Sequence, residues 1–330
     1  MPAMQPALVS SPILRRYNGG APVLTAEQTP YPSSLVFNAA AIRYEGRYIM
    51  VFRNDYGYDP TTGRFEGTNL GLAVSDDGLC WQVQPAPCWS LQTDEIQRVY
   101  DPRLTVLEGQ VYLCFAADTG HGLRGGVART EDFYHYDILS MSLPDNRNLT
   151  LFPERIGGRY VRLERPMPVY SRGRDRFDVW LSRSPDLRYW GDETLVLAVE
   201  QVPYANDKIG PAAPPIRTDK GWLALFHAVD VDPNRGKNGW EPAWRKRYCA
   251  GVMLLDLEDP SRVLGVAQRP LIAPETVWET DEGFRTNVIF PCSMLEGDKG
   301  EARIYYGASD AVICLATAGV DDLVREALEF

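Results

Sequence analysis

The sequence has few histidines, and several common catalytic patterns are missing from it. Only 3 histidines occur in 330 residues, and there is no H-x-x-x-H, G-x-S-x-G or P-loop pattern. Such patterns hold a zinc ion, place a nucleophilic serine or cradle a nucleotide phosphate. Zinc hydrolysis, a serine triad and nucleotide binding therefore lack motif support, and we expect neither a metal nor an organic cofactor.

Long apolar runs and an excess of basic residues are also absent. No stretch approaches the roughly 20 apolar residues that cross a bilayer, and the opening segment MPAMQPALVSSPILRRY lacks the apolar run of a secretory signal. Lys and Arg number 34 against 44 Asp and Glu, a formal net charge of −10. We therefore expect no nucleic-acid or membrane partner, since both favour a basic surface. A small anion in a local basic pocket remains compatible with this charge.

The cysteines lack the spacing of a disulfide framework or a zinc site. All six are scattered and none forms a C-x-x-C pair: Cys80, Cys88, Cys114, Cys249, Cys292 and Cys314. In a chain of this length they are interpreted as buried, reduced thiols. Together with the missing signal, this predicts a cytoplasmic protein.

What is present is an apolar content of 45%, typical of a globular protein, and two internal repeats. The first repeat is a glycine that opens a short, aromatic-rich apolar run, typical of a turn followed by a β-strand. It occurs five times, as GRYIMVFR from Gly46, GQVYLCFA from Gly109, GRYVRLER from Gly158, GWLALFH from Gly221 and GEARIYYG from Gly300.

The second repeat has the form Ser/Thr-x-Asp-x-x-x-aromatic. It spans Ser75–Trp81, Thr130–Tyr136 and Ser184–Trp190, with a degenerate fourth copy in LLDLEDPSRV from Leu254. Each copy follows an apolar strand, where the Asp can cap a turn and the aromatic ring can anchor the loop against its blade.

The spacing of these repeats predicts an all-β fold. Units of roughly 50–65 residues suit four-stranded blades, and five of them fill the chain as one five-bladed β-propeller domain over residues 1–330. The tail VDDLVREALEF is expected to form a short amphipathic helix. A β-sandwich with accidental similarity between its strands is the alternative that the pattern leaves open.

Charged groups follow the five repeat strands just where those strands end. Arg53 ends the first copy and Asp55 follows it, Asp118 follows the second, Arg165 and His227 end the third and fourth, and Asp310 follows the fifth. Strands of successive blades end around one central channel, so these groups predict a polar pocket of the size of a sugar.

Two further residues are candidates with competing interpretations. Asp101 precedes Pro102, which stiffens the backbone and suits a general acid, although an ordinary Asp-Pro turn has the same sequence. Lys208 lies in the Gly- and Pro-rich segment NDKIGPAAPPIRTDKGW, where it could meet an anion or be an exposed loop lysine. His227 could be a buried structural residue or part of the same anion site.

Several segments resemble glycoside hydrolase family 130. They include VFNAAAIRYEGRY, GLAVSDDG, YDPRLT, LFPERIGGRYVRLERP, NDKIGPAAPPIRTDKGW, NVIFPC and IYYGASD, and the resemblance runs from about Asn38 to the C-terminus. It implies a five-bladed propeller and inverting phosphorolysis, in which a β-mannoside and inorganic phosphate give α-mannose 1-phosphate and a shortened acceptor. Phosphate is then a co-substrate, and the partners are small molecules.

The resemblance also implies roles for individual residues. Asp101 corresponds to the general acid, which in the family is thought to act through the mannose 3-hydroxyl. The mannosyl site corresponds to Asn38, Arg53, Asp55 and Asp310. The phosphate pocket corresponds to Arg147, Asn148, Arg165, Lys208 and His227, with Tyr305 or Tyr306 nearby.

The acceptor side is expected to lie in two segments, RPMPVYSRGRDRFDVW and NRGKNGWEPAWRKRY. Both are most similar to the branch that acts on 4-O-β-D-mannosyl-D-glucose, which implies glucose as the acceptor. Trp240 and Trp244 could stack on a sugar or pack in a homo-oligomer contact. Phosphorylases of β-1,4-mannooligosaccharides, mannosyl-N-acetylglucosamine or β-1,2-mannosides, a β-mannosidase and a non-catalytic sugar-binding propeller remain alternatives.

Overall fold

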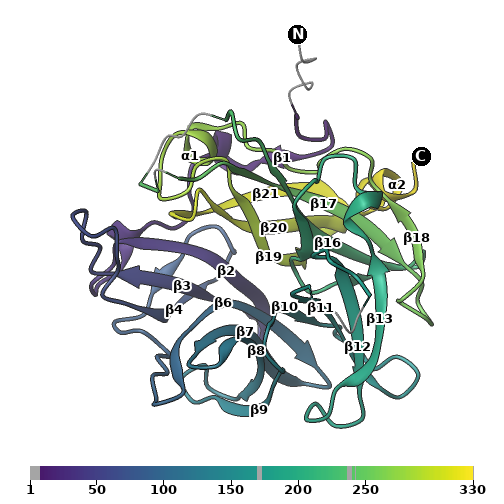
Figure 1. Cartoon of the computed structure of the whole chain (residues 1–330), viewed down its shortest axis with the longest axis horizontal. Coiled ribbons are helices and arrows are strands. Elements are labelled where there is room, and N and C mark those ends of the chain that lie inside the picture. Colours follow the sequence, from purple (N-terminus) through teal and green to yellow (C-terminus); the bar gives the residue numbers. More distant parts are fainter. Residues whose placement is uncertain (1–7, 169–172, 236–239, 242, 330) are drawn as a thin grey trace.

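The computed structural model describes residues 8–168, 173–235, 240–241 and 243–329. They form five antiparallel sheets set around a central axis, as Figure 1 shows. Within each sheet, successive strands of the chain are hydrogen-bonded to one another, which is the order of a propeller blade; β1, which joins β21, and the split first strand of blade 4 are the exceptions. The predicted five-bladed β-propeller is confirmed.

The blades follow one another along the chain. Blade 1 contains β2 Leu35–Tyr44, β3 Arg47–Tyr56, β4 Gly67–Ser75 and β5 Gln82–Val83. Blade 2 contains β6 Ile96–Leu107, β7 Gln110–Thr119, β8 Gly122–Thr130 and β9 Asp137–Met141. Blade 3 contains β10 Asn146–Leu151, β11 Tyr160–Pro166, β12 Val179–Ser184 and β13 Gly191–Leu197. Blade 4 contains β14 Lys208–Pro211, β15 Ile216–Arg217, β16 Trp222–Val231, β17 Lys246–Leu255 and β18 Val263–Val266. Blade 5 contains β19 Ile289–Glu296, β20 Glu301–Ala308, β21 Val312–Gly319 and, from the N-terminal region, β1 Arg15–Arg16.

Strand β1 closes the ring. It pairs antiparallel with β21, so residues from the two ends of the chain share blade 5. The predicted C-terminal helix is present as α2, Val320–Leu328, and packs its buried face on β17, β18 and β21. The other helix, α1, spans Val277–Thr280. No helix in the described ranges is long and apolar enough to cross a membrane.

The glycine-led repeat is the second strand of every blade, namely β3, β7, β11, β16 and β20. All five opening glycines have positive φ, from 74° to 154°, the conformation that only glycine adopts without strain. Three of these strands also carry a phenylalanine whose ring lies over a glycine of the next strand. The pairs are Phe52 with Gly71, Phe115 with Gly126 and Phe226 with Gly251.

The second repeat forms the turn after the third strand of blades 1 to 3. Asp77, for example, accepts hydrogen bonds from the backbone N–H groups of Leu79 at 2.8 Å and Cys80 at 2.9 Å. Asp132, Asp186 and, in the degenerate copy, Asp256 cap their turns in the same way. The predicted capping is confirmed.

The aromatic ring that closes this repeat packs against its own blade, as predicted, and also contacts the preceding blade. Within blade 3, for example, the Arg162 guanidinium lies 4.0 Å from the centroid of the Trp190 ring. The Trp81 ring of blade 1 meets Tyr305 of blade 5, with centroids 5.7 Å apart. Trp190 of blade 3 donates a hydrogen bond of 3.2 Å to Ser140 of blade 2. The repeat therefore joins neighbouring blades.

The first strand of each blade lies next to the axis, and it is irregular at one level around the ring. A register shift occurs after Phe37 in β2, Tyr100 in β6, Arg147 in β10 and Pro291 in β19. In blade 4 the corresponding strand is split into β14 and β15. Such bulges redirect side chains and are common next to active sites.

Two predictions of local structure are wrong at this level. Asp101 lies inside β6, at a bulge with φ of 52°, and not in a turn ahead of a strand. The bulge accommodates Pro102, which could not join a regular central ladder. Lys208 begins β14 beside the axis and is not an exposed loop residue, because its backbone pairs with Val229 of β16.

Candidate active site

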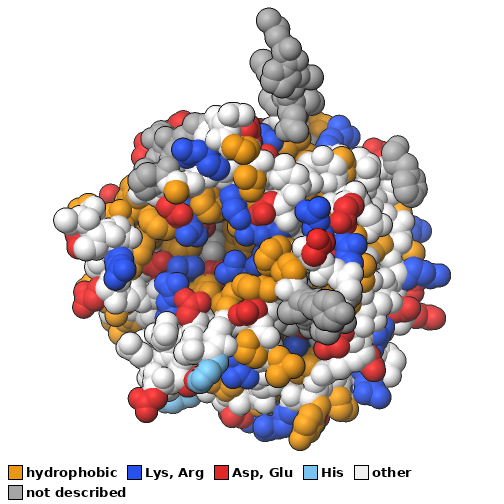
Figure 2. All heavy atoms as spheres, viewed as in Figure 1, with side chains coloured by type: hydrophobic (Ala, Val, Ile, Leu, Met, Phe, Trp, Pro, Cys, Tyr) orange, Lys and Arg blue, Asp and Glu red, His pale blue; other side chains and the backbone are white. Residues whose placement is uncertain are grey.

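A polar cavity opens near the axis, at the level of the bulges. Figure 2 shows a hollow near the middle of this face, with basic and acidic side chains gathered around it. Six of the ten residues predicted from the sequence line the cavity: Asn38, Arg53, Asp101, Arg147, Arg165 and Asp310. They come from β2, β3, β6, β10, β11 and the β20–β21 turn, so all blades except blade 4 contribute to this set.

Asp101 is held by groups that favour its charged form. Asn38 Nδ2 donates to Asp101 Oδ1 at 2.8 Å, and Arg53 Nη1 lies 3.4 Å from the same oxygen. Burial alone would raise the pKa of this carboxyl, but the charges of Arg53 and Arg103 together with the Asn38 hydrogen bond hold it below its ordinary value. Asp101 is therefore a carboxylate at neutral pH.

Asp55 lies behind Arg53, outside the cavity lining, and is hydrogen-bonded to it. The Arg53 guanidinium donates twice to it, over 2.9 Å from Nε and 2.7 Å from Nη2. Thr68 Oγ1 adds a third hydrogen bond of 2.7 Å to the same carboxylate. Asp55 thus orients Arg53 toward Asp101, and it does not itself line the cavity.

The opposite side of the cavity has an excess of buried cations. Arg165 Nη1 lies 3.2 Å from Nε2 of His227. Lys208 Nζ lies 3.9 Å from Asp207, whose carboxylate also receives a 2.8 Å hydrogen bond from Lys246. One shared carboxylate cannot balance this group, and within the described part of the chain Arg147 Nε and Arg165 Nε have no hydrogen-bond partner.

The pKa values of these groups reflect the crowding of positive charge. Burial, followed by the charges of Arg165, Lys246 and Arg147, lowers the pKa of Lys208 to about 6. Burial and Arg147 lower the pKa of Arg165 to about 9, and burial and Arg165 hold that of His227 well below its usual range. Such a cluster is stabilised when an anion enters it.

Asn148 and His227 lie behind the cavity surface. Asn148 follows Arg147 at the bulge of β10, with φ of 59°, and only 2% of it is exposed. Its amide N and O have no hydrogen-bond partner among the described residues, and the same is true of His227 Nδ1. Buried polar groups without a hydrogen-bond partner lower the stability of the fold, and a bound ligand or water that pairs with them removes this penalty.

Asp310 also lines the cavity and lies in the tight β20–β21 turn. Its φ is 48°, and Arg285 Nη1 lies 3.4 Å from its Oδ2. Burial raises the pKa of the Asp310 carboxyl above its ordinary value, although Arg285 and Arg53 oppose this effect. Opposite charges therefore lie on different sides of the site. The carboxylates come from blades 1, 2 and 5, and the cations that lack enough carboxylate partners come from blades 3 and 4.

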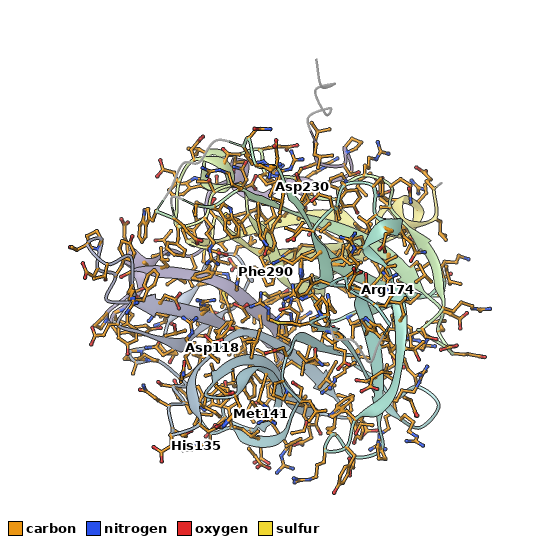
Figure 3. All side chains as sticks on the ribbon, viewed as in Figure 1. Asp118, His135, Met141, Arg174, Asp230 and Phe290 are labelled. Carbon is orange, nitrogen blue, oxygen red and sulfur yellow. The ribbon has the colours of Figure 1, made fainter. Side chains whose placement is uncertain are left out.

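Neither Tyr305 nor Tyr306 lines the cavity, so placing one of them there was wrong. The Tyr305 hydroxyl donates to the carbonyl of Gly78, and the Tyr306 hydroxyl donates to Glu279 at 2.8 Å. Both belong to β20, the second strand of blade 5, whose side chains point into the packing between blades. Asp118 also lies outside the cavity lining, paired with Arg98 at 2.6 Å; Figure 3 places it away from Phe290, which lies near the centre of the ring.

Several lining residues were not predicted as site residues from the sequence. They are Tyr100, Tyr248, Arg285, Val288 and Phe290, whereas Trp244 was proposed to stack on a sugar or to pack in an oligomer contact. Tyr100 directly precedes the Asp-Pro pair, and Phe290 lies within the NVIFPC segment. Their positions at motifs already singled out in the sequence are the signal that could have identified them. Residues 169–172, 236–239 and 242 of the two predicted acceptor segments lie outside the described residues.

The arrangement can act on a neutral, hydroxyl-rich molecule beside an anion. Two carboxylates, Asp101 and Asp310, face the cavity, Asp101 lies close to hydrogen-bonding groups, and the cations across from it can orient an oxyanion. Among the residues described, no three His, Cys, Asp or Glu side chains come together as a set that could hold a metal ion.

Comparisons with known proteins agree with this geometry. A family model for glycoside hydrolase family 130, described as beta-1,4-mannooligosaccharide phosphorylase, matches residues 9–327. The chain is 32% identical to a beta-1,4-mannooligosaccharide phosphorylase of Ruminococcus albus, covering 94% of this chain and 90% of that protein. It is 31% identical to a 1,2-beta-oligomannan phosphorylase of Thermoanaerobacter sp., covering 94% and 98%.

Two further comparisons concern the acceptor and the fold. A 4-O-beta-D-mannosyl-D-glucose phosphorylase of Bacteroides fragilis is 26% identical, with 95% of this chain and 80% of that protein covered. The solved structure of the beta-1,2-mannobiose phosphorylase of Listeria innocua superposes with a TM-score of 0.81 at 22% identity, covering 95% and 99%. That likeness supports the propeller fold alone.

Proposed function

The chain belongs to glycoside hydrolase family 130, and from this we propose that it transfers the mannosyl group of a β-mannoside to inorganic phosphate with inversion. The products are α-D-mannose 1-phosphate and a shortened acceptor sugar. One observation carries the proposal: the two carboxylates that line the cavity, Asp101 and Asp310, contact Arg53 and Arg285, whereas the cation cluster across from them lacks enough carboxylates to balance it. Phosphate supplies the missing negative charge and is also the nucleophile.

In this reaction Asp101 is the general acid. It gives a proton to the glycosidic oxygen as the acceptor leaves, and the proton of hydrogen phosphate restores the acid when phosphate attacks the anomeric carbon. Because Arg53, Arg103 and the Asn38 hydrogen bond lower the pKa of Asp101, the proton must be stabilised when substrates bind. A phosphate dianion beside Arg147 and Arg165 has that effect, since it offsets the charges that favour the carboxylate.

The remaining predicted residues divide between two binding functions. Asn38, Arg53 and Asp310 offer donors and acceptors to the mannosyl hydroxyls, and Asp55 holds Arg53 in place. Arg147, Arg165 and Lys208 bind phosphate, with Asn148 and His227 supporting them from behind. An inverting hydrolase would need a second carboxylate to activate water, whereas phosphate is already an anion and needs only to be oriented.

The acceptor remains open between two candidates. The sequence segments around the insertion favour glucose, which makes the substrate 4-O-β-D-mannosyl-D-glucose. The relatives named as acting on mannose-containing oligosaccharides share 31–32% identity, against 26% for the mannosylglucose enzyme. This difference favours a mannosyl acceptor, linked β-1,4 or β-1,2, as the second candidate.

A product assay tests both levels of the proposal. The enzyme is incubated with β-1,4-mannobiose, β-1,2-mannobiose, 4-O-β-mannosylglucose and mannosyl-N-acetylglucosamine, each with and without phosphate, and the products are identified. We expect α-mannose 1-phosphate only when phosphate is present. Release of free mannose at the same rate without phosphate would establish a β-mannosidase instead, and binding without turnover would establish a sugar-binding protein.

A further inference from the structure

Arg285 connects two carboxylates that come from different parts of the ring. Its Nη1 lies 3.4 Å from Asp310 Oδ2, and its Nε donates a hydrogen bond to Glu241. Glu241 belongs to the insertion between β16 and β17 of blade 4, and Asp310 belongs to the β20–β21 turn of blade 5. The side chain is 38% exposed and forms part of the cavity wall, yet the proposed reaction gives it no part.

The backbone around Arg285 is attached to the same turn. Its N–H donates to the carbonyl of Ser309 at 3.0 Å, and the Ser309 N–H donates to the carbonyl of Val288 at 2.9 Å. Ser309 and Asp310 both have positive φ, 50° and 48°, which a short polar side chain tolerates best. The position of Asp310 therefore depends on the 285–288 segment.

The neighbours of Arg285 hold the described end of the insertion. The N–H groups of Trp240 and Glu241 each donate to the carbonyl of Phe284 at 3.2 Å. Trp244 Nε1 donates to the carbonyl of Thr286 at 2.9 Å. Three consecutive residues, 284–286, thus connect the insertion of blade 4 to the turn that carries Asp310.

Four aromatic rings pack together around residues 284–286: Tyr58, Phe65, Trp240 and Phe284. The Tyr58 and Trp240 rings lie 4.6 Å apart, the Phe65 and Phe284 rings 5.4 Å apart, and Trp240 remains 40% exposed. The Arg285 guanidinium lies over the rings of Trp244, at 4.8 Å, and Phe284, at 5.2 Å. Apolar ring faces beside a polar cavity suit the face of a sugar ring, and Trp244 already lines the cavity.

We propose that Arg285 is a positioning residue that fixes Asp310 toward the sugar and holds Trp240 and Trp244 at the acceptor side, and so determines how well an acceptor sugar binds. The inference rests on the proposed phosphorylase function. Asp310 is buried near two other carboxylates, Asp55 and Asp101, so removal of the Arg285 charge favours its protonation. A protonated Asp310 no longer accepts a hydrogen bond with both oxygens from the sugar.

Two variants separate the two contacts of Arg285. Arg285→Gln removes the charge from both carboxylates, and Glu241→Gln weakens only the contact to the insertion. The Michaelis constants for phosphate and mannoside are measured in phosphorolysis, and that for the acceptor in synthesis from α-mannose 1-phosphate. Arg217→Gln, at an exposed pair with Glu154, is the matched control and should behave as wild type.

We expect Arg285→Gln to lower kcat/KM for the mannoside by about tenfold to a hundredfold, the range for a lost charged hydrogen bond. It should also shift the acid limb of the kcat profile to higher pH. Glu241→Gln should raise the acceptor KM and leave kcat within about twofold of wild type. For both variants the phosphate KM should stay within about twofold, because the phosphate side of the cavity is formed by other blades.

The inference is overturned if folded Arg285→Gln matches wild type, or if it raises the phosphate KM as much as the acceptor KM. If Arg285→Gln does not fold, Glu241→Gln decides, and an unchanged acceptor KM in that variant overturns the inference. A wild-type enzyme that makes no α-mannose 1-phosphate from any mannoside overturns the proposed function itself. The two failures are therefore distinguishable.

Discussion

Asn38 and Asp101 occupy equivalent bulges in the innermost strands of neighbouring blades and are joined by a hydrogen bond of 2.8 Å. Both have positive φ, 50° and 52°. Asn and Asp tolerate this conformation better than most residues. The bulges bring the two side chains together although they are 63 positions apart in the chain.

Asp101→Asn should lower kcat by about 10²–10⁴, the usual contribution of a general acid, because the amide cannot give a proton to the leaving oxygen. Asn has nearly the size of Asp and keeps the φ preference of the bulge, so the unfolding temperature should change little. Phosphorolysis rates and thermal unfolding of the same preparation measure the two effects. Asp76→Asn, at an exposed pair with Arg47, is the control; equal loss in both variants would argue against Asp101 as the acid.

Lys208 should make anion binding depend on pH. Its pKa of about 6 means that the amine is mostly neutral above pH 6, whereas a bound dianion favours the ammonium form. Binding therefore takes up a proton, and the Kd for sulfate should increase by up to about tenfold per pH unit above pH 6. Sulfate is the probe because its charge is constant in this range, and calorimetry at several pH values gives the Kd.

Lys208→Met is the matched variant for that titration. It should bind sulfate more weakly at pH 6 and with a flatter dependence on pH. The groups around the amine are Arg165, Arg147, Lys246, Tyr248 and Asp207. An equally steep dependence in Lys208→Met would show that another of these groups takes up the proton.

Gly126→Ala should destabilise the fold. A Cβ at this position would lie 2.1 Å from Cζ of Phe115, and the ring is buried between blades and cannot move away cheaply. Overpacking of this kind costs about 1–3 kcal/mol. Gly191→Ala is the control, since a Cβ there meets no atom within 4 Å and its φ is not positive; urea unfolding should separate the two variants, and equal free energies of unfolding would contradict the prediction.

Arg16→Met should weaken the closure of the ring. Arg16 lies in β1 and donates at 2.8 Å to Glu279, which is fully buried and also accepts a hydrogen bond from Tyr306. Removing the cation leaves a buried carboxylate without its partner, at a cost of about 3–5 kcal/mol. The double variant with Glu279→Gln should recover part of that loss in the free energy of unfolding; no recovery would mean that Arg16 acts through packing alone.

The sequence by itself determined the architecture. Its two repeats reflect local rules. A glycine with positive φ opens the second strand of every blade, and an Asp caps the turn after the third strand in blades 1 to 3 and, in the degenerate copy, in blade 4. Local rules of this kind are visible in a window of a few residues. The polar groups at the strand ends were visible for the same reason, and so was the family resemblance, which rests on continuous segments.

Only the tertiary structure decided which of these groups meet. Asp118 has the same sequence context as Asp310, yet it pairs with Arg98 outside the cavity. Tyr306 occupies the strand position that Phe52 has in blade 1, and both side chains are fully buried in the packing and away from the cavity lining. The orientation of a side chain depends on bulges and on the angle between blades, and neither is encoded in spacing along one strand.

Arg285 shows the limit most clearly. Nothing in its local sequence indicates that it contacts Glu241, 44 positions away, and Asp310, 25 positions away. Those contacts exist because the ring brings an insertion of blade 4 against a turn of blade 5. Propeller closure, a property of the whole chain, places the described end of that insertion next to the turn that carries Asp310.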